Sequence, residues 1–168
     1  MKRIISLIIV VCALFALVSC GDKKAYEADT KSFSKSGITL TLTEAFEEGS
    51  KEGYAAFYSS DDVLVFMLKE TFDSFTNKKL TLAKYAEFVK EANEDKSPSD
   101  VINENGLTYL EYSVKNAASG KTYKYFTAVF EGTDAFWCVQ FVCFESAYAE
   151  YKPYFINWAK TVTFAPKA

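Results

Sequence analysis

The sequence contains no histidine among its 168 residues. Histidine is the commonest general base in enzymes, and it is needed for Ser-His and Cys-His nucleophiles and for nearly all catalytic zinc sites. The G-x-S-x-G motif of serine hydrolases is also missing. We therefore predict that the chain is not an enzyme and binds no cofactor.

Cysteine is scarce as well, with four in the chain. Cys12 and Cys20 belong to the N-terminal segment, which leaves Cys138 and Cys143 for the folded part. On one strand these two would point to opposite faces, about 16 Å apart. A disulfide needs Cα atoms within about 7 Å, so we expect two unbridged, buried thiols.

Charge is nearly balanced, with a formal net charge of -3. This slight acidity argues against nucleic acid as a partner. Two acidic groups, Glu47-Glu48 with Glu52 and Asp61-Asp62, are the only candidates for a calcium site. No D-x-D-x-D-G spacing occurs among them, so we expect solvated acids and predict no metal site.

The most informative segment is the N-terminus. Lys2 and Arg3 precede an apolar run from Ile4 to Val18 that only Ser6 interrupts. A basic start, a short apolar stretch and a small-residue junction are typical of an export signal. Leu17, Val18 and Ser19 then form the peptidase recognition site of a lipobox, with Cys20 as the lipid attachment residue. The alternative is an ordinary secretory signal that contains a cysteine.

This interpretation divides the chain into three parts. Residues 1–19 are the lipoprotein signal peptide, residues 20–31 the lipidated cysteine and a polar tether, and residues 32–168 a single domain. We expect lipid on Cys20 to hold the protein to the outer side of the bacterial cytoplasmic membrane or to the periplasmic face of a Gram-negative envelope, because stable attachment needs two or more acyl chains and lipoprotein processing supplies them.

Turn signals divide the domain into strands and two helices. Asn105-Gly106 is the strongest hairpin signal, because both turn positions need a positive φ. Thr81 is the expected N-cap of a first helix, and Pro153 is expected to start or kink a second. The predicted strands span 38–42, 54–58, 63–69, 101–104, 107–114, 122–130, 136–144 and 162–164; residues 44–53 are predicted as a short helix or loop, and the last helix lies within 147–161.

The strands at 122–130 and 136–144 are apolar on both faces. A sheet with one wet face would alternate with polar residues, so both faces need cover. We therefore predict an α+β fold: an antiparallel meander of about six strands, flanked by helices on both faces as an α/β/α sandwich. Trp158 and Phe155 of the last helix should face the sheet.

Aromatic residues make up 17% of the chain. Tyr109, Tyr123 and Tyr125 are candidates for a surface platform that contacts a glycan or a partner peptide. The favoured interpretation is that these rings pack the sheet beneath a helix.

The order of these elements resembles that of the PsbP-like superfamily. The resemblance rests on Gly37-Ile38-Thr39-Leu40-Thr41-Leu42, the helix beginning at Leu80-Thr81-Leu82, and the closing segment from Tyr154 to Phe164. That group includes the extrinsic photosystem II protein, DcrB-type bacterial lipoproteins and a Ran-binding import factor. The resemblance implies an α/β/α sandwich and a binding or assembly role through protein partners.

The expected function is that of a membrane-anchored extracytoplasmic lipoprotein, a non-enzymatic module that binds a protein partner in the cell envelope. A lipoprotein that binds a small ligand or glycan is the alternative. An envelope hydrolase is the least favoured class.

Overall fold

The computed structural model describes residues 24–76 and 80–166. It contains an antiparallel sheet of seven strands, a smaller sheet of three, and two α-helices. The strands are β1 (Thr30–Lys35), β2 (Ile38–Thr43), β3 (Glu47–Gly49), β4 (Ala56–Ser59), β5 (Leu64–Thr71), β6 (Ile102–Glu104), β7 (Leu107–Lys115), β8 (Thr122–Glu131), β9 (Ala135–Phe144) and β10 (Thr163–Phe164). The helices are α1 (Leu82–Glu91) and α2 (Tyr148–Ala159).

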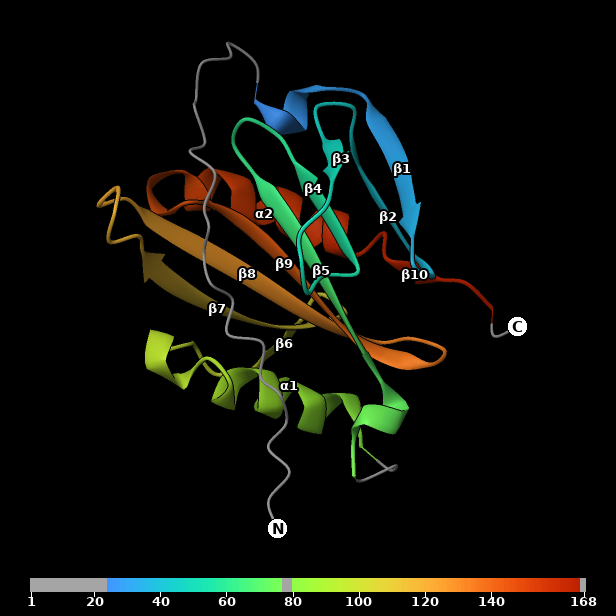
Figure 1. Cartoon of the computed structure of the whole chain (residues 1–168). Coiled ribbons are helices and arrows are strands. Elements are labelled where there is room, and N and C mark those ends of the chain that lie inside the picture. The colour runs from blue at the N-terminus through green and yellow to red at the C-terminus, as the bar shows by residue number, and fades with distance from the viewer. Residues whose placement is uncertain (1–23, 77–79, 167–168) are drawn as a thin grey trace.

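The larger sheet has the strand order β3-β4-β5-β9-β8-β7-β6, with every neighbouring pair antiparallel (Figure 1). Strands β6 to β9 form the predicted meander. Its first hairpin turns at Asn105 and Gly106, whose φ angles of 56° and 76° are the positive values that the sequence predicted. The α+β class with an antiparallel sheet is therefore confirmed.

The number and grouping of strands differ from the prediction of one sheet of about six. Residues 47–49, predicted within a helix or loop, form edge strand β3. The predicted closing strand, β10, pairs with β2 in the separate sheet β1-β2-β10. Strand β1 was not predicted, because its Ser and Lys residues gave it the composition of a polar tether.

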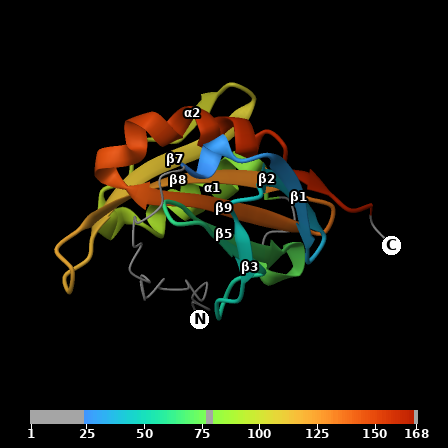
Figure 2. The ribbon, with the colours of Figure 1, turned by 90° about the horizontal axis from the view of Figure 1, so that it is seen from above.

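Each face of the larger sheet has its own apolar core. On one face, α1 contributes Tyr85, Ala86 and Val89. On the other, α2 contributes Phe155 and Trp158, and β2 of the smaller sheet joins the same core. The predicted sandwich, with helices covering both faces of the sheet, therefore matches the structure only roughly. One face is covered by α2 together with the smaller sheet (Figure 2).

The two helices begin differently. The Thr81 side chain accepts a hydrogen bond from the Lys84 backbone N–H at 3.3 Å, so Thr81 is the N-cap predicted for α1. Helix α2 begins at Tyr148, five residues before Pro153, and continues through the proline. The expectation that Pro153 starts the helix is therefore wrong. Proline removes one backbone N–H donor, and packing of Tyr151, Phe155 and Trp158 offsets that loss.

The folded chain begins earlier than predicted. Ala25–Glu27 forms a 3-10 turn, and Ala25 is 3% exposed within the α2-side core. Residues 25–31 were predicted as part of a free tether, which their polar composition suggested. They belong to the domain instead, because Ala25 and Tyr26 pack against α2.

Both cysteines of the domain are free and buried on β9. Cys138 lies in the core under α1, and Cys143 in the core under α2, so they occupy opposite faces as predicted. No helix within the described residues is long and apolar enough to cross a membrane.

The closing helix provides a test of the α2-side core. Trp158 is 6% exposed, and its ring lies edge-on to Phe46 with centroids 5.3 Å apart. We expect Trp158→Ala to lower the free energy of unfolding by about 3–5 kcal/mol, because it removes a large buried ring. Urea denaturation of the variant measures this, with exposed Asn157→Ala as the control; a near-neutral Trp158→Ala would contradict this packing.

Candidate functional site

The three tyrosines predicted as candidates for surface contact are all buried. Tyr109 is 1% exposed, and Tyr123 and Tyr125 are each 2% exposed. Tyr109 lies in the core under α2, whereas the other two lie in the core under α1. The surface platform is therefore wrong, because the three rings do not share a face. Their burial agrees with the favoured interpretation, that these rings pack against the sheet.

One polar cluster lies between β7 and α2, a position that spacing along the sequence does not reveal. Here the Lys152 ammonium lies 2.6 Å from Glu111 Oε1, and the Glu111 side chain is 14% exposed. The Tyr148 hydroxyl is buried beside them, without a well-aligned hydrogen bond to any described residue. We call Glu111, Tyr148 and Lys152 the β7–α2 cluster.

The pKa values of two members of the β7–α2 cluster, Lys152 and Tyr148, are shifted by their surroundings. The hydrogen bond to Glu111 raises the pKa of Lys152. Burial, with the Glu111 carboxylate as a further cause, raises the pKa of Tyr148 far above its ordinary value. The ammonium therefore stays charged and the phenol stays neutral at pH 7. The ion pair joins helix α2 to strand β7, and neither the charged Lys152 nor the neutral Tyr148 is a base or nucleophile near neutral pH.

A shallow pocket of about 430 Å³ lies beside the segment that precedes α2. It is lined by Lys121, Thr122, Phe144, Glu145 and Ser146. The Lys121 ammonium lies 4.6 Å from the centroid of the Phe144 ring, and the Ser113 hydroxyl donates a hydrogen bond of 2.6 Å to Glu145. The pocket thus combines one cation, one anion and one ring, a set suited to a small polar ligand.

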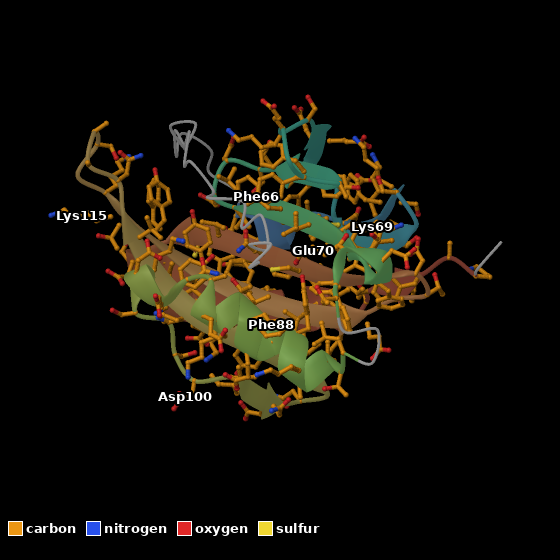
Figure 3. All side chains as sticks on the ribbon, turned by 60° about the horizontal axis from the view of Figure 1, so that its bottom comes forward. Phe66, Lys69, Glu70, Phe88, Asp100 and Lys115 are labelled. Atoms are coloured by element: carbon orange, nitrogen blue, oxygen red, sulfur yellow. The ribbon has the colours of Figure 1, made fainter. Side chains whose placement is uncertain are left out.

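On the α1 face of the larger sheet, the buried Tyr85 and the half-buried Glu70 join α1 to β5. The Tyr85 hydroxyl donates a hydrogen bond of 2.7 Å to Glu70 on β5, and the Tyr85 ring stacks on Phe136 with centroids 4.7 Å apart. Figure 3 shows Glu70 on the side of the sheet that α1 covers. Burial raises the pKa of Tyr85 and of Cys138, so neither supplies a nucleophile near neutral pH.

The acidic pairs considered for calcium are dispersed. Glu48 on β3 forms an ion pair with Lys35 at 2.6 Å, and Asp62 accepts a hydrogen bond of 2.7 Å from the Tyr151 hydroxyl. No group of three or more metal-ligating side chains occurs within the described residues. Glu48 and Asp62 therefore each interact with a neighbour of their own, and the described acids do not converge.

One catalytic spacing does occur, because Ser32-Phe33-Ser34-Lys35 matches S-x-x-K. On a helix this spacing places the serine and lysine side by side, but here it lies on strand β1. Residues three apart on a strand point to opposite faces. Ser32 instead lies 3.3 Å from the Thr41 hydroxyl, and Lys35 pairs with Glu48.

The N-terminal turn forms a second cluster, which the sequence did not suggest. The Ala25 N–H donates to the Tyr151 hydroxyl at 3.3 Å, and the Thr43 hydroxyl donates to the Ala25 carbonyl. Tyr26 stacks on Tyr154 with centroids 4.1 Å apart. We call Ala25–Glu27 and these partners the N-terminal clasp. The predicted lipobox residues Leu17, Val18, Ser19 and Cys20 lie outside the described residues.

No protein-family model and no curated protein matches this sequence. Among solved structures, the chain is similar to cyanobacterial PsbP (CyanoP) from Synechocystis sp. PCC 6803, at 13% identity and a TM-score of 0.52. That match covers 88% of this chain and 98% of CyanoP. The fold is PsbP-like.

A second similar structure comes from Bacteroides thetaiotaomicron VPI-5482, at 10% identity and a TM-score of 0.52. It covers 83% of this chain and 49% of the other. At these identities the PsbP-like likeness concerns architecture alone.

The β7–α2 cluster predicts a specific stability effect. Lys152→Met leaves the Glu111 carboxylate in a largely buried position without its cation. We expect this to lower the free energy of unfolding by about 1–3 kcal/mol, the cost of an unsatisfied buried polar group. Adding Glu111→Gln should recover part of the loss in urea denaturation, because the uncompensated charge is removed. A Lys152→Met variant with the same free energy of unfolding as the parent protein would show that the ion pair contributes nothing to stability.

The buried phenols predict a loss of stability in alkali. Burial raises the pKa of Tyr58 to about 12 and holds those of Tyr148 and Tyr151 still higher. In the unfolded chain these phenols ionise near pH 10, a lower pH than in the folded protein. Above pH 10 the unfolded state therefore binds fewer protons than the folded state, and the free energy of unfolding falls as the pH rises. The free energy of unfolding should fall by about 1.4 kcal/mol per pH unit for each phenol.

Urea denaturation from pH 8 to 11, with phenolate absorbance, checks this pH dependence. Tyr148→Phe should reduce the slope above pH 10 and leave it unchanged at pH 8. Ionisation of most of the eleven tyrosines near pH 10 in a protein that remains folded would contradict the prediction.

Proposed function

We propose that this chain is an exported bacterial lipoprotein, anchored through lipid on Cys20, whose domain binds or assembles with a protein partner in the cell envelope. The observation that carries the proposal is the Leu17-Val18-Ser19-Cys20 sequence after a basic and apolar leader. It would place the protein on the outer side of the cytoplasmic membrane or on the periplasmic face of the envelope. The cysteine thiol would receive the lipid before cleavage after Ser19.

The start of the folded domain supports the anchored arrangement. Ala25 is buried against α2 five residues after Cys20, so the domain follows the proposed lipid almost directly. Each buried methylene contributes about 0.8 kcal/mol, and two or more chains make attachment stable. No membrane-spanning helix is needed for this kind of attachment.

A non-enzymatic role agrees with the chemistry of the described residues. Glu111, Glu70 and Asp62 each interact with a tyrosine or lysine that packs a helix onto a sheet. Cys138 and Cys143 are buried, and burial raises the pKa of both thiols. The PsbP-like resemblance implies a binding or assembly role, and we propose that the chain is a lipoprotein of the DcrB type.

A second candidate function is the binding of a small polar ligand or glycan. The pocket at Lys121, Phe144 and Glu145 favours it, because an ammonium beside an aromatic ring and a carboxylate can hold a ligand with both donors and acceptors. Its shallow shape makes it the weaker candidate.

The lipid anchor is tested by changing the cysteine that carries it. Cys20→Ala should abolish incorporation of a labelled fatty acid and leave an unprocessed precursor, since the thiol is the lipid acceptor. Cys12→Ala is the matched control, because Cys12 lies inside the signal and should leave lipidation unchanged. Normal lipidation and processing of Cys20→Ala would refute the lipoprotein assignment.

The binding role is tested by affinity capture of the lipidated protein from its own envelope after cross-linking. We expect one stoichiometric envelope protein to be retained. Retention of a small molecule or glycan instead, lost on Lys121→Ala, would favour the second candidate and overturn the first.

A further inference from the structure

We propose that the anchored domain keeps one orientation relative to the membrane: the N-terminal clasp faces the lipid surface, and helix α1 faces away from it. This inference rests on the proposed lipid anchor at Cys20. It adds to that proposal by assigning which surface meets the bilayer and which surface is open to a partner.

The length of chain between Cys20 and the clasp limits how the domain can turn. Lys24 is four residues after Cys20. Even fully extended, four residues span at most about 14 Å. A domain of about 140 residues has a radius of gyration of about 14.5 Å, which corresponds to a sphere of radius about 19 Å. Because the reach is shorter than the radius, the attachment point must stay in the half of the domain nearer the membrane.

The attachment point is fixed on the domain by the clasp. The Tyr151 hydroxyl accepts from the Ala25 N–H and donates to Asp62, which joins the turn both to α2 and to the loop between β4 and β5. Tyr26 adds a ring contact with Tyr154 and a hydrogen bond to Glu150. These contacts keep Ala25–Glu27 on the fold and prevent it from lengthening the tether.

The clasp and α1 lie on opposite sides of the larger sheet. Ala25 belongs to the core under α2, and Tyr85 and Val89 of α1 belong to the core on the other face. Figure 1 shows the N-terminal turn above the sheet and α1 below it. The membrane-facing surface therefore comprises the clasp, the first half of α2 and the β4–β5 loop, whereas α1 projects outward.

The charges near the clasp indicate that the tether, and not attraction to lipid, sets this orientation. Glu27, Asp61 and Glu150 are exposed on this side, whereas Lys24, the cation that directly precedes the clasp, is half-buried. Anionic headgroups would repel these carboxylates, so adsorption would turn the domain the other way. A tether-imposed orientation is insensitive to salt, whereas an electrostatic one weakens as the Debye length falls.

The outward surface is the exposed side of α1 and the loop that follows it. Lys84 and Glu91 are exposed there, and Phe88 is half-buried with the Lys84 ammonium 5.2 Å from its ring centroid. Figure 3 shows Phe88 and Asp100 on this side of the molecule. The proposed envelope-protein partner meets this surface first when it approaches from the aqueous side.

The test measures the height of two labelled positions above a vesicle surface. Asp61→Cys, in the β4–β5 loop, and Lys84→Cys, on α1, are expressed as full-length lipidated chains, labelled with a donor dye and reconstituted in vesicles of neutral and anionic phospholipid with acceptor-labelled lipid. The parent protein should take no dye under native conditions, because Cys138 and Cys143 are buried. Matching thermal unfolding of both variants shows that they are folded.

We expect strong energy transfer to the lipid from the dye at position 61 and clearly weaker transfer from the dye at position 84. This difference should be the same at low and at high salt. Inserting twelve Gly and Ser residues after Gly21 should reduce this difference, because the reach then exceeds the radius of the domain. Equal transfer from both positions at native tether length, stronger transfer from position 84, or a difference that salt abolishes would each overturn the proposed orientation. Failure of the lipid anchor is recognised separately, since the parent protein would then carry no lipid on Cys20 and would not attach to the vesicles.

Discussion

The structure depends on the two central strands, β8 and β9, being apolar on both faces. Phe126, Phe141 and Val139 face one core, and Tyr125, Val142 and Phe136 face the other. Sheet residues of this kind contribute to stability only when both sides are shielded from water. The chain meets that requirement with α1 on one side and with α2 and the smaller sheet on the other. Two polar contacts, Glu111 with Lys152 and Glu70 with Tyr85, occur where a helix meets the sheet.

Local signals in the sequence were sufficient for much of this architecture. Asn105-Gly106 needs positive φ angles, Thr81 can accept a hydrogen bond at a helix start, and Cys138 and Cys143 alternate across a strand; each of these depends on near neighbours. The strands β1 and β3 were missed for the opposite reason. Their residues are mostly Ser, Lys and Glu, and they are extended because β2 and β4 offer backbone partners. The amino-acid composition of a segment does not show which strand its backbone will pair with.

The candidate site shows the same limit more strongly. Glu111 and Lys152 are 41 positions apart in the sequence, and Tyr151 reaches Asp62 from 89 positions away. No periodicity links such residues, because their proximity follows from the packing of α2 across the sheet. The buried positions of Tyr109, Tyr123 and Tyr125 could be predicted only in general terms, since tyrosine occurs both in cores and on binding surfaces.

The N-terminal clasp also has a mechanical consequence. If the protein is pulled by a lipid on Cys20, the load enters the domain at Ala25–Glu27. From there it passes through Tyr151 and Tyr154 into α2, the helix that carries Phe155 and Trp158. Strand β1 follows the clasp in the chain and is therefore shielded from the force. Extraction of such a protein from a bilayer would strain its core before it could peel a strand from the edge of the sheet.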